Sequence, residues 1–261
     1  MTHGDASVSH SGNARLSSVG AALRLLKEFS AEEPEIGITL LAKRLHLAKS
    51  TVHRLASTLV GEGFLEQNPS SERYRLGLSL FALGTLVRRR MDVSREALPF
   101  LHELRDRTGE SVHLAVIEGA EIMYLFNLES QQAIGVRSYL GLRKPAFCTS
   151  EGRSLLAFSS PAVLSRIIKK GLTAHTHKTI TEPAALHKLL AEVKLKGHAV
   201  DDGESEEGMR GLAAPVRDAS GVVIAAVGLA GPVSRLSKKS LRSFTPWVIA
   251  AADGISARLG H

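Results

Sequence analysis

Apolar side chains recur at helical spacing near the start of the chain, after a segment without any such pattern. Residues 1–15 are small and polar, rich in Ser, Gly and His, and we expect a disordered tail there. From Val19 to Phe29, apolar residues follow one another at intervals of three and four positions. That spacing predicts a first helix over about residues 17–30.

Two more helices are predicted close behind the first. Thr39 suits the N-cap of a short helix over 40–46, and a tight connection over 47–49 leads to a third helix over 50–62. With residues placed 100° apart, the apolar positions of the third helix fall on one side, which we expect to face a core. These positions are Val52, Leu55, Ala56 and Leu59.

A hairpin and an exit helix complete this first unit. Residues 64–67 and 73–76 have the composition of strands, and the intervening 68–72 has the composition of a turn. A further amphipathic helix carries Leu80, Leu83 and Val87 and ends in three arginines. Its apolar side packs on its own domain or contributes to a dimer contact.

From about Leu98 onward, strands and helices alternate. Two apolar runs, 112–117 and 122–128, flank a short turn and predict a hairpin. Helices are predicted over 98–108, 150–158, 162–170 and 182–196, strands over 212–217 and 222–229, and a last helix from about 241 to 259. Strands joined by hairpins and interleaved with helices indicate an α+β domain on an antiparallel sheet.

Length and composition place the chain among two-domain globular proteins. At 261 residues it is long enough for two domains, and 44% hydrophobic residues can fill a core. No apolar stretch approaches the roughly 18–20 residues of a membrane helix, and the N-terminus lacks the pattern of a signal peptide. Cys148 is the only cysteine, so a disulfide within the chain and a cysteine-based zinc finger are excluded. We therefore expect a cytoplasmic protein with no membrane partner.

Positive charge suggests a polyanionic partner. The net charge is +7 and the pI is near 9.7, which suits DNA, RNA or acidic lipid alike. The first 90 residues hold 12 Lys and Arg against 8 Asp and Glu, or +4. Charge is therefore densest where the three helices and the hairpin are predicted.

The outer side of the third helix has the chemistry of a DNA-binding surface. It offers small polar groups and one Arg, and it has no acid before Glu62. Small side chains allow a helix to enter the major groove, where Arg can bind guanine, while hydroxyls and the helix N-terminus suit phosphates. The predicted contacts on this helix are Lys49, Ser50, Thr51, His53, Arg54 and Ser57.

The hairpin adds two arginines. Along the return strand Arg73 and Arg75 alternate with Tyr74 and Leu76, so we expect the apolar pair to be buried and both guanidinium groups to point outward. The arginines either contact DNA as a wing or only raise solubility. A capped helix, a turn, a second helix and a hairpin, in that order, form a winged helix-turn-helix.

Seven segments carry a resemblance to one family. The chain resembles the IclR family of bacterial transcriptional regulators in its helix-turn-helix, its wing and four later motifs. The segments are Ile38–Leu55, Gly63–Glu66, Arg73–Gly77, Gly109–Val116, Gly197–Glu204, Leu212–Val216 and Gly231–Leu236.

That resemblance implies a two-domain regulator. A winged helix-turn-helix over 16–78 would be joined by a linker helix over 79–97 to a GAF-like effector-binding domain over 98–261. Members bind palindromic double-stranded operators as homodimers or dimers of dimers, act as repressors or activators of catabolic operons, and respond to a small organic metabolite. No cofactor is implied.

The resemblance also implies an effector site. Its matching residues here are Thr149, Ser150, Glu151, Asp201, Met209 and Gly211. Ser150 either holds a ligand or only caps its helix. Where the family has a Cys, this chain has Gly211, and Glu151 replaces a small or neutral residue. A carboxylate at 151 would repel an acidic effector unless Lys144 or Arg153 compensates, so the effector class stays open between a keto acid and a neutral or aromatic molecule.

Enzyme chemistry is not expected. The chain has no Gly-x-Ser-x-Gly motif and no phosphate-binding loop, and Cys148 is expected to be a small buried thiol. The alternative is a GAF-like small-molecule sensor or enzyme whose winged helix binds another protein. Such a helix would present apolar residues on its outer side.

Overall fold

The computed structural model describes residues 18–89, 92–130, 132 and 141–261. The chain divides into two compact units, Met1–Val87 and Arg88–His261. The tail expected over 1–15 lies outside the described residues.

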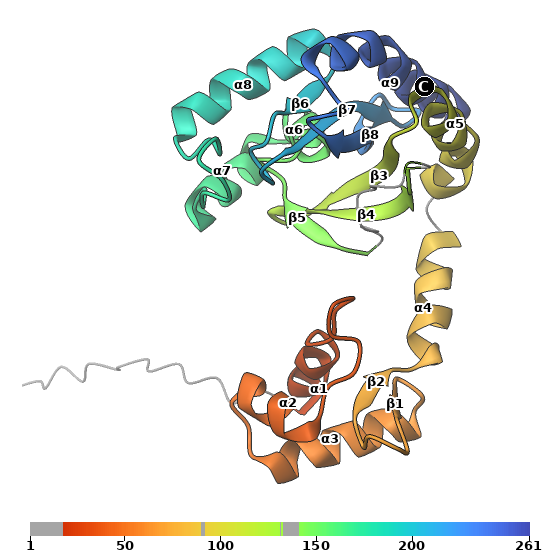
Figure 1. Cartoon of the computed structure of the whole chain (residues 1–261), viewed down its shortest axis with the longest axis vertical. Coiled ribbons are helices and arrows are strands. Elements are labelled where there is room, and N and C mark those ends of the chain that lie inside the picture. Colours follow the sequence, from red (N-terminus) through yellow and green to blue (C-terminus); the bar gives the residue numbers. More distant parts are fainter. Residues whose placement is uncertain (1–17, 90–91, 131, 133–140) are drawn as a thin grey trace, which may run out of the picture. The chain divides into compact units, whose positions relative to one another are not determined.

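The first unit contains helices and a small hairpin (Figure 1). Its strands β1 and β2 are antiparallel, with Glu66 directly opposite Arg75. The elements are α1 (Ser18–Leu26), α2 (Ile38–Leu45), α3 (Lys49–Gly61), β1 (Leu65–Gln67), β2 (Tyr74–Leu76) and α4 (Leu78–Arg89), the last of which begins in this unit.

One core holds these elements together. Leu25 of α1, Leu41 of α2 and Val52 of α3 are fully buried against one another. Ile36 extends the hairpin, because its backbone N–H and C=O each form a 2.9 Å hydrogen bond with Tyr74. The segment before α2 is thereby fixed to the wing, and both helices of the helix-turn-helix are fixed to the hairpin.

Three local predictions in this unit are wrong. The N-cap of α2 is Gly37 rather than Thr39, and Lys49 begins α3 rather than ending the turn. Thr39 instead lies inside the first turn of α2, because the chain reaches helical geometry two residues early. Leu76 is 44% exposed although its neighbour Tyr74 is buried, because the core of this unit ends at Leu65 and Tyr74.

The second unit is built on one six-stranded antiparallel sheet with strand order β5-β4-β3-β8-β7-β6. The hairpin β3–β4 and the hairpin β7–β8 meet in the middle, where β3 pairs with β8. The elements are α5 (Asp92–Thr108), β3 (Ser111–Glu118), β4 (Glu121–Leu128), β5 (Arg143–Pro145), α6 (Ser150–Leu156), α7 (Pro161–Lys170), α8 (Pro183–Lys196), β6 (Ala199–Asp201), β7 (Met209–Arg217), β8 (Val223–Pro232) and α9 (Lys238–Arg258).

Helices cover both faces of this sheet (Figure 1). On one face α5 and α9 bury a core that includes Leu101, Val248 and Ile255. On the other face α6, α7 and α8 bury a second core around Leu155 and Ile167. The α+β class and the antiparallel sheet flanked by helices are therefore as predicted from the sequence.

The pattern did not predict two edge strands. β5 and β6 have three residues each, too few for a period of two to be recognised. The range 79–97, predicted as one linker helix, contains most of α4 and the beginning of α5. Among the described helices, none combines the length and apolarity needed to cross a membrane.

Candidate nucleic-acid interface and ligand cavity

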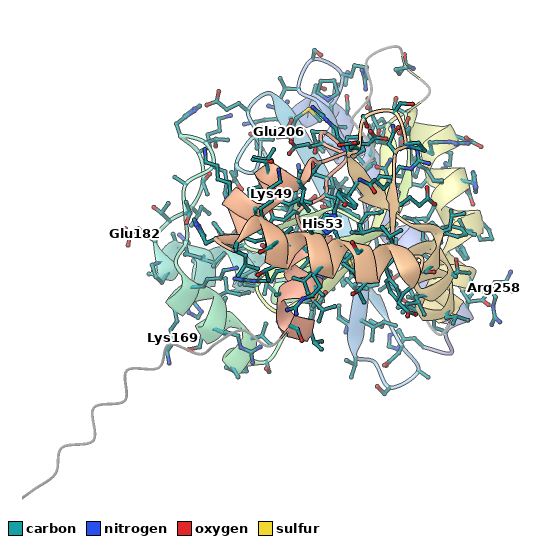
Figure 2. All side chains as sticks on the ribbon, turned by 90° about the horizontal axis from the view of Figure 1, so that it is seen from below. Lys49, His53, Lys169, Glu182, Glu206 and Arg258 are labelled. Atoms are coloured by element: carbon teal, nitrogen blue, oxygen red, sulfur yellow. The ribbon has the colours of Figure 1, made fainter. Side chains whose placement is uncertain are left out.

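The outer side of α3 is exposed along its whole length. Lys49, Ser50, His53, Arg54 and Ser57 are all exposed, and Thr51 is half-buried. Figure 2 shows Lys49 and His53 on this helix. The six predicted contact residues of α3 therefore share one accessible surface.

The inner side of the same helix packs into the core of the first unit. Val52 and Ala56 are completely buried, and Leu55 is 8% exposed. These three side chains belong to the core of the first unit. Because the core fixes the rotation of α3, the outer side chains have a defined direction.

The beginning of α3 is open to an anion. Its N-cap is Ala48, in an extended conformation, which has no side-chain oxygen to accept a hydrogen bond from the first turn. The backbone N–H groups at a helix start have no partner within the helix. Together with the Lys49 side chain and the Ser50 hydroxyl, they form a set of donors suited to a phosphate.

The two wing arginines differ. Arg75 pairs with Glu66, directly opposite in the hairpin, at 2.8 Å between Nη2 and Oε2, and it lies 3.9 Å from Glu35. Arg73 is exposed, and the described residues include no ion pair for it. The guanidinium of Arg73 is thus available for a binding partner. The guanidinium of Arg75 would first have to break its contacts with Glu66 and Glu35.

A small cavity gathers the residues predicted for an effector. Its volume is about 20 Å³, enough for about one water molecule. All six predicted residues line it, together with six that were not predicted as contacts. The full lining is Tyr124, Lys144, Thr149, Ser150, Glu151, Asp201, Ser205, Glu206, Met209, Arg210, Gly211 and Ala230.

Thr149, rather than Ser150, caps α6. Its Oγ1 accepts a hydrogen bond from Gly152 N at 3.3 Å. The Ser150 hydroxyl instead donates to Glu151 Oε2 at 3.0 Å. The alternative in which Ser150 only caps its helix is therefore wrong.

Asp201 organises the turn that follows β6. Its Oδ1 accepts hydrogen bonds from Glu204 N at 2.8 Å and Ser205 N at 3.3 Å, and its Oδ2 contacts the Ser205 hydroxyl. Burial raises the pKa of Asp201 above its ordinary value, although these hydrogen bonds oppose the rise. The carboxyl of Asp201 thus accepts its hydrogen bonds mainly from the turn that follows β6.

Glu151 is buried in contact with His113, a residue that sequence analysis missed as part of the site. Their Oε1 and Nδ1 atoms lie 3.2 Å apart, and both side chains are almost fully buried. Burial alone would raise the pKa of Glu151, but the hydrogen bond and charge of His113 and the Ser150 hydroxyl hold it below its ordinary value. A histidine inside the apolar run 112–117 was the available signal for this contact.

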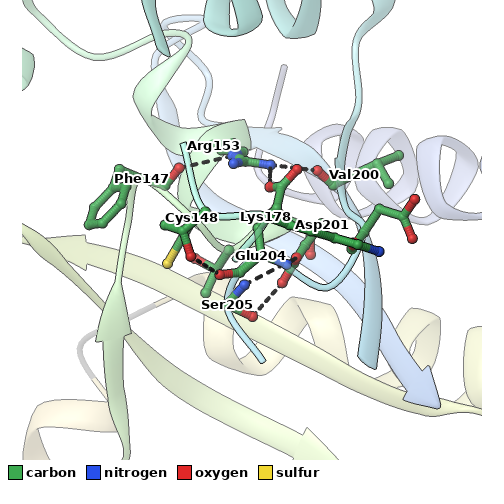
Figure 3. A network of polar contacts seen from close by, with 12 residues as sticks. Phe147, Cys148, Arg153, Lys178, Val200, Asp201, Glu204 and Ser205 are labelled. Carbon is green, nitrogen blue, oxygen red and sulfur yellow. Dashed lines mark hydrogen bonds and ion pairs between the residues drawn. The ribbon is translucent and has the colours of Figure 1, made fainter. Parts of the chain in front are cut away.

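A second buried ion pair lies behind the cavity. Arg153 is completely buried, pairs with Glu204, and donates to the backbone oxygens of Phe147 at 2.9 Å and Val200 at 3.0 Å (Figure 3). The guanidinium therefore connects α6 to the segment 147–149 and to β6.

Cys148, next to this ion pair in Figure 3, is a buried thiol. Burial, with the nearby Asp201 carboxylate, raises its pKa to about 12. At neutral pH almost none of it is thiolate, the form that acts as a nucleophile.

A larger groove of about 500 Å³ lies between α7 and α8. Leu164, Ile168 and Leu190 form apolar parts of its lining, with Lys169 and Lys194 beside them. It contains none of the residues predicted for an effector, and the smaller cavity has the converging polar groups that are typical of a specific ligand site.

The comparisons with known proteins agree over both units. The family model for the IclR helix-turn-helix domain matches residues 18–69, and the model for the C-terminal part of the bacterial transcriptional regulator IclR matches 85–257. The HTH-type transcriptional regulator KdgR of Escherichia coli is 36% identical over 231 residues, which is 88% of each chain. The regulator XynR of the same species is 34% identical over 247 residues, covering 94% of this chain and 98% of XynR.

Among solved structures, the chain is similar to an IclR homolog from Microbacterium hydrocarbonoxydans in complex with 4-hydroxybenzoate. The TM-score is 0.83 at 29% identity, and the match covers 93% of this chain and 99% of that one.

Proposed function

Because this chain belongs to the IclR family and is a DNA-binding regulator of transcription, we propose that α3 enters the major groove of a palindromic operator and that a small metabolite in the second unit controls this binding. The regulated genes encode the catabolism of that metabolite. The proposal rests on the exposed side of α3, which joins hydroxyls, a histidine and an arginine on a helix fixed by a buried core.

Arg54 carries base recognition in this proposal. It is exposed in the middle of α3, from where a guanidinium can donate two hydrogen bonds to guanine. Lys49, Ser50 and Thr51 bind phosphates at the beginning of the helix, and Arg73 binds the backbone from the wing. Phosphate contacts fix the position of the helix, and base contacts select the sequence.

A second copy of the chain completes the binding unit. One helix-turn-helix contacts too few base pairs to select an operator within a genome. Helices α1 and α4 of the first unit each carry exposed apolar side chains, and Phe81 of α4 is 72% exposed. Together, as the α1–α4 surface, these residues are Val19, Leu23, Leu78, Phe81, Leu83, Leu86 and Val87. We propose that a second copy covers it, giving a homodimer that can pair further into a dimer of dimers.

The effector binds in the cavity at the beginning of α6. The similar solved protein was crystallised with 4-hydroxybenzoate, which supports a small organic ligand for this fold. Thr149, Ser150, Glu151, Met209 and Gly211 would contact it, whereas Asp201 would hold the segment 202–205 in place.

The alternative, a winged helix that binds another protein, has less support. Protein interfaces are centred on apolar and aromatic side chains. On the exposed side of α3 only Val60 is a large apolar residue, at 37% exposed.

A selection from random duplexes tests the proposal. The purified protein at moderate salt should enrich one palindromic sequence, and a metabolite that binds the second unit should change the affinity for that sequence. Failure to enrich any sequence would contradict the DNA-binding part. An operator whose binding no retained metabolite changes would contradict the effector part alone.

A further inference from the structure

Both cations in the lining of the cavity are engaged by acids of the protein. Lys144 Nζ lies 3.1 Å from Glu206 Oε2. Arg210 pairs with Asp202 and donates to the backbone oxygen of Leu236 at 3.0 Å. The charge of each cation is therefore already balanced by a carboxylate of the protein.

Arg153, the other candidate to balance Glu151, is also engaged. Its charge is paired with Glu204, and it donates to Phe147 O and Val200 O, while its Nη2 is buried without a partner among the described residues. Acids of the protein therefore balance these three cations, and the group that directly contacts Glu151 is His113.

Hydrogen-bond acceptors remain at the α6 end of the cavity. Glu151 accepts from Ser150 through Oε2 and contacts His113 through Oε1. Each carboxylate oxygen can accept about two hydrogen bonds, and the carboxylate also accepts one from the backbone of Glu151, so about one acceptor position remains. The Ser150 oxygen donates its proton to Glu151 and keeps its own lone pairs.

Two glycines preserve room for these acceptors. A Cβ on Gly228 would lie 2.9 Å from Glu151 Oε1, and a Cβ on Gly211 would lie 2.5 Å from Ser150 Oγ. Any larger residue at either position would push the carboxylate or the hydroxyl aside. The replacement of the family's Cys by Gly211 therefore does not enlarge the cavity, because Ser150 occupies that space.

Asn127 is a further polar residue on the face of the sheet that carries His113. It lies directly opposite His113 in the β3–β4 ladder, so the two side chains project from the same face. Its amide nitrogen and oxygen are both buried, and neither has a partner among the residues that the structure describes.

We infer that the effector is a neutral molecule carrying several hydroxyl groups, such as a sugar or polyol, and that its hydroxyls donate to Glu151. This inference rests on the proposed effector function of the cavity. A hydroxyl can donate a hydrogen bond to the carboxylate of Glu151. A ligand carboxylate has no proton to donate and meets the charge of Glu151 in a buried site.

The expected discrimination is large. Two unit charges about 4 Å apart repel by about 4 kcal/mol at an effective dielectric constant of 20, which corresponds to about 10³-fold in affinity. Relaxation and proton uptake reduce this value, and we expect at least about a tenfold preference for an alcohol over its matched acid. The cavity of about 20 Å³ must also enlarge when such a ligand enters.

The test is equilibrium dialysis of the full-length protein against two sets of probes. One set is a bacterial metabolite extract. The other contains matched alcohol and acid pairs: glycerol with glycerate, xylitol with xylonate, and glucitol with gluconate. Mass spectrometry of the retained fraction should identify a hydroxylated neutral molecule, held at least about tenfold more tightly than its acid.

Variants connect the preference to Glu151. Glu151→Gln should lower the affinity for the neutral ligand about tenfold and raise the affinity for the matched acid, so that the preference for the neutral ligand disappears. Glu192→Gln, an exposed acid on α8, should leave both affinities unchanged. If Glu151→Gln does not fold, Ser150→Ala should weaken the neutral ligand several-fold without strengthening the acid.

Three results would overturn the inference. They are a carboxylate preferred by the wild-type protein, a preference unchanged in both variants, and an empty retained fraction. If the protein retains no metabolite, the proposed effector function is contradicted as well. If it prefers a carboxylate, the effector function stands and only the assignment of the effector as a neutral molecule is wrong.

Discussion

The carboxylate of Glu151 fills the space that any side chain at position 228 would need. An ideal Cβ on Gly228 would lie 2.9 Å from Glu151 Oε1, 2.8 Å from the Cβ of Ala213 and 2.8 Å from the backbone oxygen of Leu212. Gly228 pairs with both His113 and Ala213 in the central strands. A glycine in the middle of the sheet thus makes room for a charged side chain from α6.

Gly228→Ala should therefore destabilise the second unit. Overpacking a tight core costs about 1–3 kcal/mol. In a Glu151→Ala background the same substitution should cost less, because one of the three close contacts is gone. Urea unfolding followed by the fluorescence of Trp247, the single tryptophan, reports the free energy of unfolding of this unit.

Gly84→Ala is the matched control for this substitution. A Cβ on Gly84, in α4, would meet nothing within 4 Å, so the Trp247 transition should not change. Equal costs of Gly228→Ala with and without Glu151 would show that the carboxylate does not fill this space.

The helix-turn-helix was predictable because its information is local. The apolar side of α3 follows from the spacing of Val52, Leu55 and Ala56, and burial agrees with that spacing. Leu76 shows where a local rule fails. Alternation along β2 predicts its burial, but whether a core exists beneath a strand depends on segments far away in the sequence.

The ligand cavity was only partly predictable. The family resemblance indicated the beginning of α6, yet the pairing of Glu151 with His113 joins residues 38 positions apart. Judged from the sequence, either Lys144 or Arg153 could also balance the negative charge of Glu151. Only the three-dimensional structure showed that Glu206 and Glu204 engage these cations instead.

Arg54→Ala should reduce operator discrimination. Loss of a bidentate contact to guanine costs about 1–3 kcal/mol for the specific site and almost nothing for random DNA. The ratio of the two affinities, measured by fluorescence anisotropy, should fall about tenfold or more. Arg166→Ala on α7 removes the same charge from the second unit and should leave the ratio unchanged, and a normal ratio in Arg54→Ala would contradict base recognition by this residue.

Arg73→Ala should weaken binding to specific and random DNA equally. Each phosphate contact contributes about 0.9 to the slope of log affinity against log salt concentration, so the slope should become shallower by about 1 per subunit, or about 2 for the proposed dimer. Arg75→Ala should have a smaller effect, because Arg75 is already paired with Glu66 at 2.8 Å. A salt titration of all three proteins decides the order, and a larger effect at Arg75 would reverse our assignment of the wing contact.

Phe81→Glu should dissociate the dimer. Phe81 is 72% exposed in the α1–α4 surface, and a charge there would oppose the burial of that surface by a second copy. Sedimentation equilibrium should show a monomer, together with weaker binding to a palindrome but not to a half-site. Leu195→Glu, at an 88% exposed apolar residue of α8, is the control, and a dimer that persisted in Phe81→Glu would place the interface elsewhere.

Arg153→Met should destabilise the second unit far more than the loss of an exposed ion pair. Removal of one partner leaves Glu204 as an unpaired charge in a largely buried site, which costs about 3–5 kcal/mol. Lys196→Met breaks the exposed pair with Glu192, whose side chains are 57% and 47% exposed, and should change the stability little, because exposed ion pairs contribute little. Replacing both partners, as in Arg153→Met with Glu204→Leu, removes the unpaired charge and should recover most of the loss, because apolar pairs replace buried ion pairs at little cost. Urea unfolding monitored through Trp247 compares the variants, and a double variant no more stable than Arg153→Met would mean that the bonds from Arg153 to Phe147 and Val200, rather than its charge, stabilise this region.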